Sequence, residues 1–143
     1  MRINPNRTLI AVFMFLMMLA FAGAAAAQQP ASLVASANGE GTIKFGKSEE
    51  FKVYAVVVKL FEDKTAEISL VTDFTVYVSG TWSRTNDASK EIAIKITGGS
   101  ASGNLDGGGK LLLKDDRKSI AGLNLQGVNK ATKKVVKADF VAK

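Results

Sequence analysis

The stretch Thr65–Ser83, TAEISLVTDFTVYVSGTWS, decides the fold. Within residues 65–72 apolar and polar side chains alternate, with Ile68 and Leu70 on one face, and the alternation returns within residues 74–83. A period of two residues predicts two half-buried β-strands. The link between them is too short for a parallel crossover, so we expect an antiparallel hairpin. In its second strand the inward side chains are Phe74, Val76, Val78 and Trp82, and the outward ones are Thr75, Tyr77, Ser79, Thr81 and Ser83.

The same pattern extends on both sides of this hairpin. We expect eight strands, at residues 42–46, 50–60, 65–72, 74–83, 91–97, 109–114, 119–127 and 134–142. The fold class is therefore all-β, a single antiparallel meander. Such a sheet must hide its edges, either as an up-and-down barrel, the lipocalin-like form, or as a two-sheet sandwich. The short connections favour the barrel. The glycine-rich stretch 98–108 is expected to be a loop, where a sandwich would cross between its sheets.

The expected interior is almost entirely aliphatic, which favours a barrel filled by its own side chains, although an apolar guest is compatible with it. The face assignment in the second strand is open, because its segment YAVVV at residues 54–58 is apolar on both sides. The expected inward side chains are Val53, Ala55, Val57, Ile68, Leu70, Val76, Val78, Ile92, Ile94, Ile96, Leu111, Leu113, Leu123, Leu125, Val136 and Phe140.

The N-terminal residues 1–27 have the layout of a secretory signal. Arg2 and Arg7 precede the apolar run Leu9–Phe21, and small residues follow, with Ala25 and Ala27 suited to a cleavage site. An uncleaved anchor is the alternative, because the segment is just long enough to cross a bilayer. We expect cleavage, no transmembrane anchor in the mature form, a flexible lead-in at residues 28–40 and one all-β domain at residues 41–143.

The chain contains neither histidine nor cysteine. This composition excludes serine–histidine and cysteine–histidine nucleophiles, histidine-ligated zinc or haem, and disulfides. Paired carboxylates remain open to an enzyme, but nearly all the acids fall at expected turns or outward positions. We therefore expect a protein that is not an enzyme and needs no cofactor or metal. An exported domain without disulfides fits a bacterial periplasmic or secreted protein.

Positive charge is concentrated at the C-terminal end. Residues 110–143 carry nine basic and three acidic residues, and Lys130, Lys133, Lys134 and Lys137 cluster there. These lysines are candidate binding residues for anionic envelope polymers or lipid headgroups. No aromatic residue interleaves with them, so nucleic acid is not an expected partner. The alternative interpretation is edge protection, because lysines on a final strand prevent pairing between sheets.

The tripeptide Gly80-Thr81-Trp82 resembles the Gly-x-Trp signature that lipocalins and avidins carry on their first strand. Here it lies mid-chain, in the fourth expected strand, so the resemblance implies no particular ligand. Trp82 is a candidate binding residue. Its alternative role is to close one end of the core, as large aromatic side chains do.

These features favour an exported, non-catalytic β-domain that binds or scaffolds in the cell envelope, in contact with anionic surface polymers or another protein. The alternative is a lipocalin-like carrier of a small apolar ligand. The sequence leaves the oligomeric state open.

Overall fold

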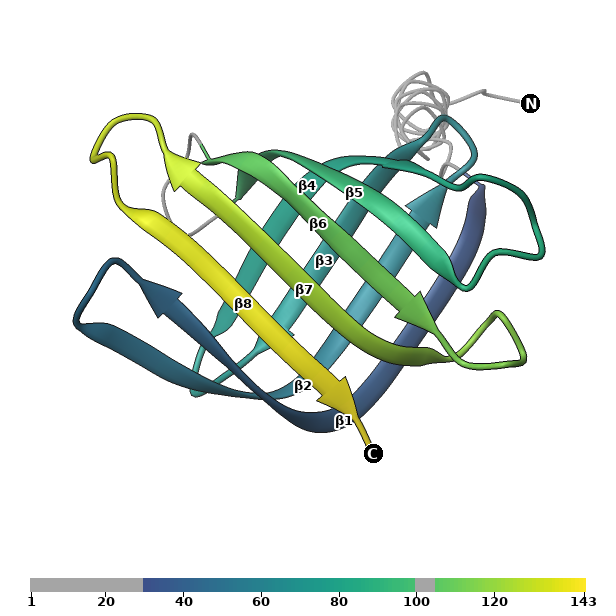
Figure 1. Cartoon of the computed structure of the whole chain (residues 1–143), viewed down its shortest axis with the longest axis horizontal. Helices are drawn as coiled ribbons and strands as arrows, with labels where there is room; N and C mark the ends of the chain where they lie inside the picture. Colours follow the sequence, from purple (N-terminus) through teal and green to yellow (C-terminus); the bar gives the residue numbers. More distant parts are fainter. Residues whose placement is uncertain (1–29, 100–104) are drawn as a thin grey trace, which may run out of the picture.

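The computed structural model describes residues 30–99 and 105–143, and eight β-strands account for most of them (Figure 1). The predicted signal segment, residues 1–27, lies outside the described residues. The strands are β1 (Ala31–Phe45), β2 (Glu49–Phe61), β3 (Thr65–Val71), β4 (Thr75–Ser83), β5 (Glu91–Gly99), β6 (Leu105–Leu113), β7 (Ile120–Asn129) and β8 (Val135–Ala142).

The strands form a closed up-and-down barrel. Each strand pairs antiparallel with the next along the chain, and β8 pairs with β1 to close the sheet (Figure 1). The predicted all-β meander of eight strands is confirmed, and of its two expected forms the structure adopts the barrel. Closure leaves most backbone groups with a partner on both sides of each strand, which is how an antiparallel sheet of this size avoids exposed edges.

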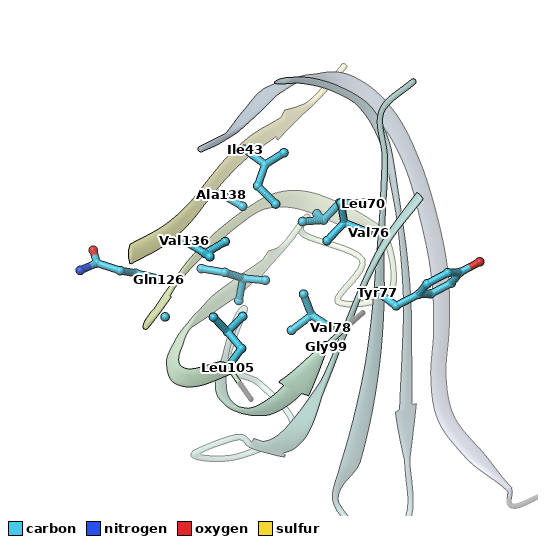
Figure 2. Close-up of a pocket in the computed structure, with 12 residues that line it drawn as sticks. Ile43, Leu70, Val76, Tyr77, Val78, Gly99, Leu105, Gln126, Val136 and Ala138 are labelled. Carbon is cyan, nitrogen blue, oxygen red and sulfur yellow. The ribbon is translucent and has the colours of Figure 1, made fainter. Parts of the chain in front are cut away.

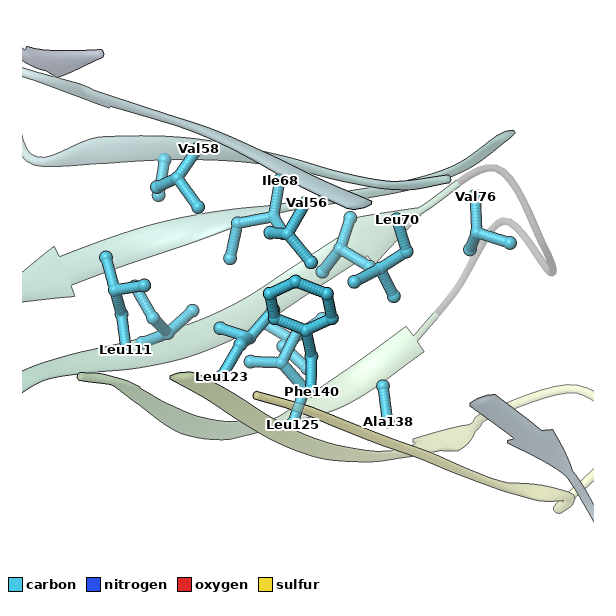
Figure 3. Close-up of a cluster of buried hydrophobic side chains, with 14 of the residues drawn as sticks. Val56, Val58, Ile68, Leu70, Val76, Leu111, Leu123, Leu125, Ala138 and Phe140 are labelled. Carbon is cyan, nitrogen blue, oxygen red and sulfur yellow. The ribbon is translucent and has the colours of Figure 1, made fainter. Parts of the chain in front are cut away.

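Aliphatic side chains from all eight strands fill the barrel (Figure 3). Ile92 and Ile96 on β5 and Leu111 on β6 are almost fully buried, as the alternating pattern predicts. Burying a side chain of this size stabilises the fold by about 1.5–3 kcal/mol. Because the chain has no disulfide, this burial and the backbone pairing are what hold the barrel together.

The β2 strand changes face along its length, which corrects part of the predicted interior. Val53 is buried, but so are Val56 and Val58, whereas Ala55 and Val57 are only half-buried. The pairing of β1 with β2 shifts register between Asn38 and Gly41, opposite this point. The prediction that Ala55 and Val57 point inward was therefore wrong, because a bulge-type irregularity breaks the period of two.

The first strand begins earlier than predicted. The expected flexible lead-in at residues 28–40 is ordered from Ala31, where β1 starts. The segment is small and polar, so its sequence carries little strand signal. Its strand conformation comes from pairing with β2, beginning at Ala31 opposite Phe61.

The glycine-rich stretch was also misassigned in part. β5 runs to Gly99 and β6 starts at Leu105, so Gly107 and Gly108, which were expected in the loop, are strand residues, as is Gly109, where the strand was expected to begin. A Cβ atom at Gly109 would lie 1.9 Å from the carbonyl oxygen of Asn124 on β7. Glycine is needed here for close approach of two strands. Residues 100–104 of the expected loop lie outside the described residues.

The barrel has two ends that differ in their side chains. We call the lysine end the one that holds the β1–β2, β3–β4 and β7–β8 turns, at residues 46–48, 72–74 and 130–134. We call the tryptophan end the opposite one, which holds the β2–β3, β4–β5 and β6–β7 connections, at residues 62–64, 84–90 and 114–119. The described residues include no helix with the length and hydropathy required to cross a membrane.

Candidate functional site

The β7–β8 turn at the lysine end is organised by a buried asparagine. The Asn129 side-chain oxygen accepts hydrogen bonds from the backbone N–H groups of Ala131 (2.8 Å) and Thr132 (3.0 Å). The Asn129 carbonyl accepts the N–H of Lys133 at 2.8 Å, and Lys133 takes a positive φ of 60°. An asparagine that captures the following N–H groups is a common way to build a tight turn. The result is a fixed turn that presents lysine side chains to solvent.

The four candidate lysines separate into two pairs. Lys130 forms an ion pair with Asp106 (3.4 Å), and Lys137 on the outer wall forms one with Asp139 (3.5 Å). Within the described part of the chain, Lys133 and Lys134 form no ion pair. Their charges are therefore the ones available to an anionic ligand.

Three phenylalanines gather at the same end of the barrel. Phe51 on β2 contacts Phe45 on β1, with ring centroids 6.0 Å apart, and Phe74 in the β3–β4 turn, with centroids 4.9 Å apart. Both pairs have the edge-to-face geometry that aromatic rings prefer. The rings form a small apolar cluster at the rim of the barrel, where Phe45 and Phe51 pack against the filled interior.

Phe74 is exposed, which corrects the prediction that it points inward. It lies in the turn before β4 and keeps 45% of its surface accessible. The turn is held by Thr72, whose side-chain oxygen donates to the carbonyl of Phe74 (2.6 Å) and accepts its N–H (3.1 Å). Thr72 therefore fixes a large apolar ring at the rim of the barrel.

The phenylalanines and one of the free lysines line a common groove. Its volume is about 370 Å³, which lies within the range of small-molecule sites. The side chain of Lys134 also lies along the β1–β2 turn, beside Gly46, which has a positive φ of 70°. The lining residues are Phe45, Glu49, Phe51, Phe74, Asn129, Thr132, Lys134 and Val136.

Both acidic and basic side chains lie at the groove, and some of the lysines have no ion-pair partner among the described residues. Glu49 is the acid in the lining. Lys44 and Glu50 form an ion pair at 2.8 Å, and the hydrogen bond from Lys44 to Glu50 raises the pKa of Lys44 above its usual range. Lys44 and Glu50 therefore largely cancel each other, whereas Lys47, Lys133 and Lys134 have no ion-pair partner among residues 30–99 and 105–143.

Trp82 lies at the tryptophan end, away from the lysines. Its indole N–H donates to the carbonyl of Phe61 (2.9 Å), and the ammonium group of Lys64 lies 3.9 Å from the ring centroid. The structure therefore does not bring Trp82 together with the candidate lysines in one site. Its half-buried ring caps the core.

One small cavity lies between the interior side chains of the described strands. The cavity lined by Ile43, Leu70, Val76 and neighbouring side chains has a volume of about 10 Å³ (Figure 2), no more than the space needed for one water molecule. Figure 2 shows Ile43, Leu70 and Val76 directed into this space, while Tyr77 and Gln126 point away from it. This cavity is too small for a ligand larger than a water molecule.

Acidic side chains do not form a metal-binding cluster in the described part of the chain. All thirteen acids are in that part, and all but the half-buried Asp139 are exposed. No group of three or more potential ligands is close enough to hold a metal ion among the described residues. The arrangement at the lysine end suits binding through charge and apolar contact.

Comparisons with known proteins find no matching family, no matching characterised protein and no matching solved structure. The site is therefore interpreted from its own geometry. Sequence reasoning found the lysines but missed the aromatic cluster they border. The sequence did contain a signal for this cluster, because Phe45, Phe51 and Phe74 each lie beside a turn. In an up-and-down barrel these turns lie at the same end.

Proposed function

We propose that this protein is an exported, non-catalytic binding protein of the bacterial envelope. Its binding surface is the groove at the lysine end, and its ligand is an anionic amphiphile such as an anionic lipid. The apolar part of the ligand lies against Phe45, Phe51 and Phe74, and its acidic group lies beside Lys133 and Lys134.

One observation carries this proposal: a single groove of about 370 Å³ combines three phenylalanine rings with Lys134. An apolar surface supplies most of the binding free energy, and a few polar groups orient the ligand. The exposed Phe74 favours an amphiphile over a purely polar polymer, since a fully hydrated polymer gains little from an apolar ring. A non-catalytic role is supported by the exposure of nearly all carboxylates, because a general acid usually needs burial to raise its pKa.

The alternative, a carrier that holds a small apolar ligand inside the barrel, has less support. The barrel architecture suits it, but the interior cavity lined by the described residues has only about 10 Å³. A drug-sized guest needs at least about 300 Å³.

Co-sedimentation with lipid vesicles tests the proposal. We expect the protein to bind vesicles rich in phosphatidylglycerol, to bind vesicles of phosphatidylcholine much more weakly, and to lose affinity as salt is raised. Phe74→Ser and the double variant Lys133→Glu/Lys134→Glu should each reduce binding about tenfold or more.

The matched control is Lys59→Glu/Lys118→Glu, which changes the net charge by the same amount at exposed positions on other parts of the barrel. It should retain most of the binding. Equal losses in the two double variants would mean that only overall charge matters, and binding that is indifferent to salt and to Phe74→Ser would reject the proposal.

A further inference from the structure

The N-terminal half of β1 has a free edge. β1 pairs with β2 from Ala31 to Phe45, but β8 pairs with β1 only from Gly39 to Phe45. Beyond that point the last contact is the N–H of Lys143, which donates to the carbonyl of Asn38 (3.0 Å). Among the described residues, nothing forms a ladder with residues 31–37 on this side, so the closed barrel has a gap in its hydrogen bonding here (Figure 1).

The backbone groups of this edge point in a defined direction. The Asn38 carbonyl points to the side of β8, as its bond from Lys143 shows. Successive residues of a strand direct their N–H and C=O groups alternately to its two sides, and the pairing with β2 is regular from Leu33 to Asn38. Ser36 and Val34 therefore direct their donors and acceptors to the free side, like Asn38.

This edge also lacks the usual protection against pairing. Natural sheets place lysine, proline or other charged residues on open edges, but residues 31–39 (ASLVASANG) contain no charge and no proline. Val34 is 63% exposed, and the other outward side chains of the segment are Ser32, Ser36 and Asn38. A neutral, extended edge with an exposed valine favours the addition of another strand.

We propose that this edge binds the same edge of a second copy of the chain, as a two-fold symmetric antiparallel pair centred on Ala35. In this register, Val34 of each copy faces Ser36 of the other, so the residues that direct backbone groups to the free side meet one another. A two-fold contact places identical surfaces together. Because residues 31–39 carry no charge, two copies of this edge can meet without repulsion between like charges. The edge also has no charge that would favour an oppositely charged partner over a second copy.

The dimer is expected to be weak and reversible, because one pair of short strands buries less surface than a standard stable interface. The contact uses residues 31–38 and leaves the groove at the lysine end uncovered. The inference therefore does not depend on the proposed function.

Analytical ultracentrifugation tests this inference on the protein expressed from its full chain and purified as the cells process it. The fraction of dimer should rise from low micromolar to near-millimolar concentration. Val34→Lys should weaken the dimer at least about tenfold, because it removes the apolar contact that the two valines make across the pair and places like charges on the pairing edge. Ser36→Pro, which removes a donor on the free side, should do the same.

Val141→Lys is the matched control. Val141 is 68% exposed on the outer wall, but it lies on β8, which has a paired strand on both sides. This variant should dimerise like the parent. A parent protein that stays monomeric across the whole range overturns the inference. A dimer that survives both Val34→Lys and Ser36→Pro, or is lost equally in Val141→Lys, also overturns it, because the contact then uses another surface.

Discussion

The two ends of this barrel use aromatic side chains in opposite ways. At the tryptophan end, Trp82 donates a hydrogen bond to Phe61 and lies under the ammonium group of Lys64, so its ring caps the core. At the lysine end, Phe74 is held outward by Thr72 and lines an open groove beside Lys134. An aromatic ring whose polar partners are satisfied within the protein serves stability. A ring exposed beside unpaired cations is available to a ligand.

The connections at the tryptophan end are also tied to one another. At the tryptophan end, Arg117 donates to the carbonyl of Ala88 (3.0 Å), and the N–H of Leu113 donates to the carbonyl of Lys90 (2.8 Å), so separate connections are tied together. Lys90 also forms an ion pair with Asp115. We therefore expect substitutions at this end to change stability, and substitutions at the lysine end to change binding.

The largest effect should come from removing the capping ring. Trp82→Ala should lower the free energy of unfolding by about 3 kcal/mol, because it leaves a void at the end of the core. Phe74→Ala should lower it by less than about 1 kcal/mol, since nearly half of this ring is already in water. Urea unfolding of both variants measures the difference. Equal losses would contradict the division between the two ends.

A smaller effect should isolate the hydrogen bond of the indole. Trp82→Phe keeps an apolar ring but removes the donor to the Phe61 carbonyl, 2.9 Å away. We expect a loss of about 1 kcal/mol, typical of one hydrogen bond. The same unfolding experiment checks it. No change would mean that water replaces the bond and that the cap acts through packing alone.

Acid should affect the turns of the two ends differently. In the β6–β7 turn at the tryptophan end, Asp116 accepts the hydroxyl of Ser119 and the N–H groups of Ser119 and Lys118, which lowers its pKa from 3.8 to about 2. A carboxyl with a lowered pKa stabilises the fold above its unfolded pKa, and this contribution is lost as the pH falls from 3.8 toward 2. At the lysine end the equivalent acceptor is Asn129, which does not titrate.

Unfolding measured between pH 5 and pH 2 should therefore show a weaker pH dependence in Asp116→Asn than in the parent. Amide exchange at Lys118 and Ser119 should be less protected at the lowest pH, while protection at Ala131 and Thr132 should hold. Parallel behaviour of the parent and Asp116→Asn would contradict the assignment of this acid sensitivity to Asp116.

The smallest effect should come from two lysines with positive φ. Lys133→Gly relieves backbone strain at the lysine end, so we expect a gain of about 0.5 kcal/mol after the entropic cost of glycine is included. Lys64→Gly relieves similar strain, at a φ of 71°, but removes the cation over Trp82. It should therefore give no gain. Thermal unfolding of both variants would sharpen the comparison, and a larger gain at Lys64 would contradict it.

Much of the barrel could be predicted from the sequence, because alternation is a direct consequence of strand geometry. Ile92, Ile94 and Ile96 face inward as the pattern indicates, and the short connections favour closure into a barrel. Where the local sequence indicated a loop but a neighbouring strand was available for pairing, the segment formed a strand. The polar segment at Ala31 became a strand because β2 pairs with it, and Gly107, expected in a loop, lies in a strand that β7 approaches closely.

The candidate site was predicted only in part. The four candidate lysines were found because charge is visible in a sequence. The sequence did not show which of them form ion pairs: Lys130 pairs with Asp106 and Lys137 with Asp139, whereas Lys133 and Lys134 form none among the described residues. The groove itself depends on three phenylalanines that are distant along the chain. Periodicity assigned Phe74 to the core, because it cannot distinguish the last inward position of a strand from the rim of a barrel.

The central claim is that a ligand binds at the lysine end and not inside the barrel. A two-dimensional NMR titration with a lysophosphatidylglycerol below its micelle concentration tests it most directly. We predict shifts at Phe45, Phe51, Phe74 and the turn at residues 129–134, with interior strand residues such as Leu111 and Leu123 unchanged. Shifts confined to the interior strands, or centred on Trp82, would contradict the account.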